Sequence, residues 1–351
     1  MSFFLAIVAL IALIAASLTV RARLRPTGLV ARRNLDDLAQ WLSTPADELL
    51  ALQPSYRVVH IPKRSGGTRT LHIPDDRTMA LQRRVHARLL RPLRVHPAAM
   101  AYERGRGPVH NAAAHSWQAV VIKLDLVDFF PSTSSERVHR YFRGLGWDPQ
   151  AADVLTKLTT VDGGLPQGAP TSPALCNRVN YLFDADLNAR VSRFRGTYTR
   201  YADDITVSFP VDYPRHVRGA LQVCLRVAHR FGYQVHTGKK RQTLRRHQRQ
   251  LVTGLVVNDG PQLTRTRRRW LRAVRHAART GRPTTLGAGE LRGWSQWERQ
   301  AAELRDQERQ RRTLELLDAL ATEASTAAAA WKLGMSPNEL RARAKWLGLE
   351  V

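Results

Sequence analysis

The spacing of apolar residues divides the chain into segments of different kinds. Leucines and a tryptophan recur at helical spacing over residues 35–52, and Ser43-Thr44-Pro45 interrupts them, which predicts two short helices. Residues 56–74 read as two strands joined at Gly66-Gly67. Residues 78–90 have one apolar face, which predicts a third helix.

The rest of the chain alternates between apolar strands and amphipathic helices. Residues 119–126 are almost continuously apolar, as expected of a strand that is buried on both faces. A β-hairpin is expected around Asp203. Further helices are predicted at 136–145, 150–158 and 215–231, followed by two short strands ending at 257. From residue 261 the pattern is helical and basic, and Ser336-Pro337-Asn338-Glu339 has the spacing of a capping box, which predicts one more short helix.

The N-terminus differs from the rest of the chain. Residues 2–20 carry no charge, and as a helix they would be long enough to cross a bilayer. Arg21, Arg23 and Arg25 follow directly. The sequence therefore predicts a transmembrane anchor over residues 1–25, with the body of the protein on the cytoplasmic side. A cleaved signal peptide is the main alternative, but no basic region precedes the apolar run. A buried helix and a misassigned start codon are further alternatives.

Charge points to a polyanionic partner. The 351 residues include 55 Lys and Arg against 29 Asp and Glu, a formal net charge of +26. Such an excess causes self-repulsion in a compact fold, so a nucleic acid is expected to bind it, although an arginine-rich composition bias is an alternative. The only cysteines, Cys176 and Cys224, exclude a disulfide framework and a cysteine-based zinc site.

Three aspartates are candidates for a metal centre. Asp203 and Asp204 lie side by side in Tyr201-Ala202-Asp203-Asp204, and Asp125 ends the buried strand. Adjacent carboxylates repel each other, and a cation relieves that repulsion. We predict that Asp125, Asp203 and Asp204 are catalytic and bind two Mg²⁺ ions about 3.5–4 Å apart. A solvated Asp-Asp turn and a helix-capping Asp125 are the alternatives.

Two segments predict contacts with a nucleotide. Residues 163–173 form a loop with three glycines and three prolines. Such a loop allows bare backbone to approach a ligand, with Gly168 in the loop and Gln167 as its long polar side chain. Lys63 and Arg69 flank the Gly66-Gly67 turn and suit a triphosphate, although a solvated basic turn is the alternative. Lys239 is a second candidate for assisting the departure of pyrophosphate.

These segments, in this order, resemble the motifs of reverse transcriptases. Residues 125–130, 165–173, 201–204 and 232–239 match four successive motifs. Residues 111–115 resemble the Asn-Ala-x-x-His signature of retron reverse transcriptases, and Val252-Thr253-Gly254 resembles their Val-Thr-Gly signature. The resemblance covers roughly residues 35–300.

The resemblance implies an α+β, right-hand polymerase fold. Residues 26–118 would form the fingers and N-terminal helices, 119–260 the palm, and 261–351 a basic helical thumb with a C-terminal extension. The implied enzyme is a bacterial RNA-directed DNA polymerase that uses deoxynucleoside triphosphates. The retron resemblance implies a cognate structured noncoding RNA and its DNA copy, joined in a branched RNA–DNA product. It also implies antiphage defence with a separate effector protein, and the anchor would place this chain on the cytoplasmic face of the inner membrane, with a cytoplasmic location as the alternative.

The resemblance also assigns roles to individual residues. Phe130 matches the position whose bulky ring excludes a ribonucleotide 2′-hydroxyl. By the same resemblance, Asn111, His115, Val252, Thr253 and Gly254 would help to recognise the cognate RNA. Another bacterial reverse transcriptase, of the group II intron or abortive-infection type, is an alternative. A membrane-bound RNA-binding protein with a vestigial polymerase site is a second alternative.

Overall fold

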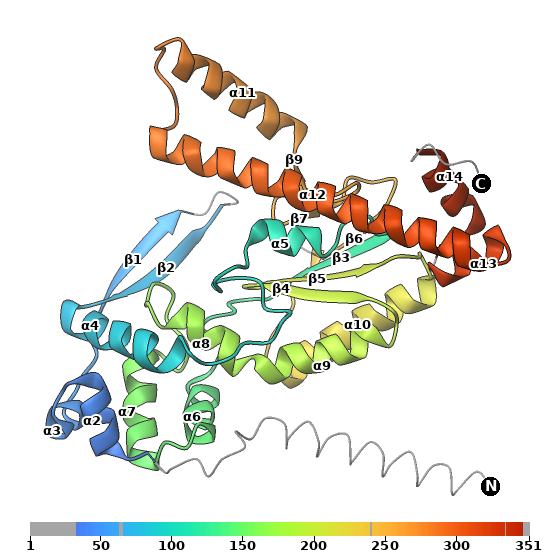
Figure 1. The fold of residues 1–351 in the computed structure, drawn as a ribbon. Coiled ribbons are helices and arrows are strands. Elements are labelled where there is room, and N and C mark those ends of the chain that lie inside the picture. Colours follow the sequence, from blue (N-terminus) through green and yellow to red (C-terminus); the bar gives the residue numbers. More distant parts are fainter. Residues whose placement is uncertain (1–32, 63–65, 239–240, 334, 347–351) are drawn as a thin grey trace, which may run out of the picture.

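The computed structural model describes residues 33–62, 66–238, 241–333 and 335–346. At its centre is a four-stranded sheet with the order β4-β5-β3-β6, in which all neighbours are antiparallel. The strands are β3 (Val120–Asp125), β4 (Thr197–Tyr201), β5 (Asp204–Phe209) and β6 (Gln242–Arg245). Helices α9 (Tyr181–Ser192) and α10 (Pro214–Arg230) cover one face of this sheet (Figure 1).

The N-terminal part surrounds one end of the sheet. Strands β1 (Tyr56–Pro62) and β2 (Thr68–Pro74) form a hairpin that stands apart from the central sheet (Figure 1). Beside it lies a group of short helices. These are α2 (Leu35–Leu42), α3 (Ala46–Leu50), α4 (Asp76–Arg84), the π-helix η1 (Val85–Leu90), α6 (Ser135–Gly144), α7 (Pro149–Thr159) and α8 (Ser172–Val179).

The C-terminal part is a long helical hairpin joined to the sheet by small strands. Helices α11 (Arg265–Arg279) and α12 (Ala288–Thr322) project from the sheet (Figure 1). A second core joins them to α5 (Pro108–Ala113) through Val252, Leu271 and Ala301. The remaining elements are β7 (Leu251–Val252), β8 (Leu255–Val256), β9 (Gln262–Leu263), α13 (Thr326–Lys332) and α14 (Pro337–Trp346).

Most of the elements expected from the sequence are present. The break at Ser43 separates α2 from α3, and Ser43 has a left-handed φ of 49°. The predicted capping box is confirmed, since the Ser336 amide donates to Glu339 Oε2 at 3.0 Å and the Glu339 amide donates to Ser336 Oγ at 3.2 Å. Helices α5 and α9 were not predicted. The boundaries between fingers, palm and thumb remain a prediction.

The predicted membrane location needs correction. Residues 2–20, on which the anchor was predicted, lie outside the described residues. Over the ranges that the structure describes, no helix is both long enough and apolar enough to cross a membrane. Helix α12 has the length, at 35 residues, but carries charged side chains from end to end. The predicted position at the inner membrane is therefore contradicted, and the transmembrane part of the predicted fold class is unsupported.

Candidate active site

The hairpin between β4 and β5 brings two adjacent carboxylates to one end of the central sheet. Ala202 and Asp203 form its tip, and Ala202 has a φ of 56°. This left-handed conformation is strained for a residue with a Cβ. The strand register places Asp204 directly opposite Asp125 at the end of β3, and the Leu126 amide donates to the Asp203 carbonyl at 3.0 Å. The predicted catalytic aspartates are therefore neighbours.

A buried ion pair supports this tip. Arg200 of β4 and Asp184 of α9 are fully buried, and two guanidinium nitrogens contact the two carboxylate oxygens at 2.8 and 2.7 Å. The same guanidinium donates to the Ala202 carbonyl at 3.0 Å and to Asn177 Oδ1 at 3.2 Å. A buried charge is tolerated when it is paired and fully hydrogen-bonded. Arg200 therefore holds the strained residue that precedes Asp203.

A cleft of about 860 Å³ opens between this end of the sheet and the β1–β2 hairpin. Asp125 and Asp203 line it. Phe130 is partly exposed there, whereas Phe129 is only 2% exposed and packs in the core. Of the residues predicted to contact the nucleotide, the cleft brings together Arg69, Phe130, Gln167 and Gly168. Lys63 and Lys239 lie outside the described residues.

The loop at residues 163–173 forms one wall of the cleft. The amide of His72 in β2 donates to the Gln167 carbonyl at 2.7 Å. Gly168 has a φ of 111°, and a Cβ there would lie 3.1 Å from the His72 carbonyl oxygen. At Gly164, a Cβ would lie 2.0 Å from the carbonyl oxygen of Pro131. A close backbone contact therefore excludes a side chain at Gly164, and the left-handed φ with a tight contact disfavours one at Gly168.

Two side chains in the cleft were not predicted from the sequence. Tyr102 lines the cleft, and its ring centre lies 6.1 Å from that of Phe130. His236 Nε2 lies 3.3 Å from Asp125 Oδ1, and the His236 amide donates to the Asp125 carbonyl at 2.8 Å. Tyr102 lies in a loop without a periodic pattern, so no sequence signal marked it. His236 lies in a recognised motif, but its contact with Asp125 depends on the fold.

The aspartates suit a divalent cation by donor type. Carboxylate oxygens are preferred ligands of hard cations, and like charges opposite each other in a ladder repel without one. In the part of the chain that the structure describes, however, no three His, Cys, Asp or Glu side chains are grouped closely enough to hold a metal ion. The donor type therefore fits a cation, while binding of a cation by these side chains, its identity as Mg²⁺ and the number of ions remain predictions.

The two signature segments contact each other. Thr253 Oγ1 donates to the carbonyl of Pro108 in α5 at 2.7 Å, and Val252 packs with Ala112 in the second core. Thr253 and Gly254 form the turn between β7 and β8, with φ angles of 45° and 81°. Two positive φ angles are those that a tight hairpin turn requires. This contact joins the β7–β8 hairpin to α5, which itself packs against both α12 and β4.

Asn111 and His115 lie in the interior. The Thr199 hydroxyl donates to Asn111 Oδ1 at 2.6 Å, and the two ring nitrogens of His115 lie 2.7 Å from Ser208 Oγ and 2.6 Å from Thr199 Oγ1. Burial lowers the pKa of His115 to about 3, so the ring is neutral near pH 7. Both side chains are fully buried. Their role in RNA recognition remains a prediction, and it would have to act through the position of α5.

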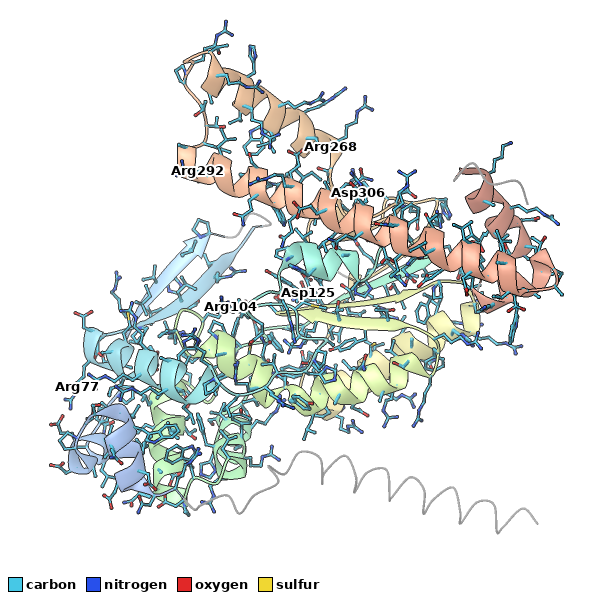
Figure 2. All side chains as sticks on the ribbon, in the orientation of Figure 1. Arg77, Arg104, Asp125, Arg268, Arg292 and Asp306 are labelled. Atoms are coloured by element: carbon cyan, nitrogen blue, oxygen red, sulfur yellow. The ribbon has the colours of Figure 1, made fainter. Side chains whose placement is uncertain are left out.

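Basic side chains cover the long helical hairpin. Figure 2 shows Arg292 on α12 towards the end that projects beyond the central sheet, and Arg268 on α11 near the end next to β9. The Arg267 guanidinium lies 4.9 Å from the centre of the Trp294 ring, and Trp294 packs edge-on to Trp270 at 5.5 Å. The tryptophans therefore pack between the helices, while arginines cover the exterior. Such a surface suits the phosphates of a duplex.

Comparison with known proteins decides the family. The family model for reverse transcriptase (RNA-dependent DNA polymerase) matches residues 61–276, from the end of β1 to α11. This chain belongs to the reverse transcriptase family. The α+β architecture is accordingly the right-hand polymerase fold of that family, with fingers, palm and thumb. Reverse transcriptases use divalent metal ions, which agrees with the carboxylates of this site.

Curated relatives place this reverse transcriptase with the retron type. Retron Mx65 reverse transcriptase of Myxococcus xanthus is 38% identical over 281 residues, covering 73% of this chain and 65% of that protein. Retron Mx162 reverse transcriptase of the same organism is 38% identical, covering 65% of this chain and 53% of that protein. Retron Ec86 reverse transcriptase of Escherichia coli is 30% identical, and the match covers 78% of this chain and 86% of that protein. The chain thus spans less than two thirds of the two Myxococcus proteins, and the predicted family is confirmed.

The buried His115 gives a testable pH dependence. Its folded-state pKa of about 3 lies below the ordinary 6.5, so unfolding takes up a proton below pH 6.5 and stability falls as the pH drops. His115→Gln removes this titration. The free energy of unfolding is measured by urea denaturation at pH 7.5 and at pH 5.5. Between these two pH values the unchanged protein should lose about 1.4 kcal/mol more of this free energy than the variant does. Equal losses in both proteins would show that His115 is not buried in its neutral form.

Proposed function

We propose that this chain is an RNA-directed DNA polymerase of the retron type. The observation that carries the proposal is the meeting of Asp125, Asp203 and Phe130 in one cleft, with Arg69 and Gln167 also lining it. A cleft of this size accommodates a nucleotide. The family match supports RNA as the template and DNA as the product.

The aspartates would hold two Mg²⁺ ions. Asp125 and Asp204 lie opposite each other on adjacent strands, and Asp203 lines the same cleft as Asp125. Bound ions would supply Lewis-acid activation of the primer hydroxyl and neutralise charge on the triphosphate. Arg69 adds a positive charge on the fingers side, where the phosphates of an incoming nucleotide would lie.

Phe130 would select the sugar. Its ring lies in the cleft with the aspartates, and its centre lies 5.9 Å from that of the buried Phe129 and 6.1 Å from that of Tyr102. These two neighbouring rings limit the movement of the Phe130 ring, so an added 2′-hydroxyl would meet an obstacle. The site would therefore favour deoxynucleotides.

The template would be part of a cognate structured noncoding RNA. The relatives' retron names and the two signature segments support this assignment. The product would then be a branched molecule in which the DNA copy is joined to its RNA. A role in antiphage defence and a separate effector protein remain predictions.

Asp203→Asn tests the proposed polymerase directly. The substitution keeps the shape of the side chain but removes the charge that would bind a cation. DNA synthesis on an RNA template with a DNA primer should fall by about 10²- to 10³-fold, while binding of the same template–primer stays within about twofold. Asp153→Asn, at an exposed carboxylate on α7, is the matched control and should leave synthesis unchanged. Undiminished synthesis by Asp203→Asn would refute the assignment of this site.

Phe130→Ala tests the selection of the sugar. Removing the ring opens the space that a 2′-hydroxyl needs. The rate of ribonucleotide addition relative to deoxynucleotide addition should therefore rise by about tenfold or more, which corresponds to a loss of about 1.4 kcal/mol in the free energy that discriminates the two sugars. Phe130→Tyr keeps the bulk of the ring and should retain the discrimination. Single-nucleotide primer extension with matched ribo- and deoxynucleotides measures both ratios. An unchanged ratio in Phe130→Ala would rule out this role.

A further inference from the structure

The last two described helices are joined by a short turn. Helix α13 ends at Lys332 and α14 begins at Pro337, so four residues of the sequence, Leu333-Gly334-Met335-Ser336, separate them. Gly334 itself lies outside the described residues. Two helices joined by three or four residues, often including glycine, are typical of the helix-turn-helix motif of DNA-binding proteins. The length and the sequence of this turn both match that motif.

Hydrogen bonds define both ends of the turn. The Met335 amide donates to the Ala330 carbonyl at 2.9 Å, which closes the end of α13. The Ser336 and Glu339 capping box starts α14 at once. Because both ends are fixed, the second helix has a defined direction relative to the first, which a helix that reads a nucleic acid requires.

The two helices share a small core of their own with the end of α12. This core contains Ala329 and Ala330 of α13 and Leu340 and Ala344 of α14, all at most 1% exposed. Leu316 and Ala319 of α12 complete it. Alanines allow the helix backbones to approach closely. The core therefore forms a three-helix unit that is separate from the palm core and from the thumb core.

The outer face of α14 is exposed and basic. Asn338, Arg341, Ala342 and Lys345 are all exposed, and their spacing places them on one side of the helix, opposite the buried Leu340 and Ala344. Glu339 is engaged in the capping box. Asn and Arg are the side chains that pair with adenine and guanine edges in the major groove, and Lys binds phosphate. The positive face therefore complements a duplex.

We propose that α13 and α14 form a helix-turn-helix that binds double-stranded DNA, with α14 in the major groove. In this motif, residues near the start of the second helix contact base edges, and Asn338 and Arg341 occupy that part of α14. B-form DNA admits an α-helix to its major groove, whereas the major groove of A-form RNA is too deep and narrow. The proposed ligand is therefore duplex DNA rather than duplex RNA.

This DNA site is distinct from the polymerase cleft. In Figure 1, α13 and α14 lie at the far end of α12, whereas the other end of α12 pairs with α11 near the fingers. The 35-residue α12 joins the two ends as one continuous helix. The chain would thus bind a DNA target at one end while a template–primer occupies the cleft. The proposal rests on the C-terminal helices alone and does not depend on the polymerase activity.

Selection from a random DNA pool tests the proposal. The probe is a pool of dumbbell duplexes, closed by hairpin loops at both ends and carrying randomised base pairs, so that no primer end is offered to the cleft. The full-length protein should enrich a defined sequence. In fluorescence anisotropy with the enriched duplex, Arg341→Ala/Lys345→Ala should weaken binding by about tenfold or more. The same sequence made as a dumbbell RNA should bind at least tenfold more weakly than the DNA.

Two controls separate this site from general charge and from folding. Arg218→Ala/Arg226→Ala removes the same charge from exposed positions on α10 and should change binding by less than twofold. Arg341→Ala/Lys345→Ala should retain the melting temperature and the template–primer extension rate of the unchanged protein. Failure to enrich any sequence, binding that is unaffected by the α14 substitutions, or equal binding of the RNA dumbbell would each overturn the proposal.

Discussion

The buried ion pair between Arg200 and Asp184 is the interaction on which the catalytic hairpin depends. Both side chains are fully removed from solvent, where an unpaired charge would be costly. The guanidinium also reaches the Ala202 carbonyl and Asn177, and lies 5.1 Å from the centre of the Phe129 ring. One planar cation thus joins β4, α8, α9 and the segment after β3. The position of Asp203 relative to Asp125 follows from these contacts.

Contacts from Asn177 extend this support to the wall of the cleft. Its side-chain nitrogen donates to the carbonyl of Ala101 at 2.8 Å, while its oxygen accepts from Arg200. Arg178, the next residue, is paired with Glu103 at 3.1 Å. Tyr102 lies between Ala101 and Glu103, which these contacts anchor, and has a left-handed φ of 63°. The hairpin tip and the loop beside Phe130 are therefore held by the same part of α8.

The sequence allowed much of the fold and of the cleft to be predicted, because their signals are local. Composition and order along the chain were enough to predict the strand β3, the loop at 163–173 and the Asp203-Asp204 turn. The partner of Arg200 could not be predicted, since it lies on α9, which was not recognised, and its pairing is a tertiary contact. Likewise, the sequence did not show that Asn111 lies in a helix, α5, with its side chain buried against Thr199 of β4. The apolar run at residues 2–20 and the arginines after it also led to a predicted membrane location, which is contradicted: over the described residues no helix could cross a membrane.

The most direct test of this account is the rate of nucleotide addition by Arg200→Lys. Lysine keeps a positive charge opposite Asp184, but it has no planar fork with which to reach Ala202 and Asn177 as well. In single-turnover extension of an RNA template with a DNA primer, the rate constant should fall by about 10- to 100-fold, as expected for a displaced catalytic group. The dissociation constant for the template–primer should stay within about twofold, which shows that the variant is folded. An unchanged rate constant in a folded variant would contradict the claim that this buried pair positions the catalytic aspartates.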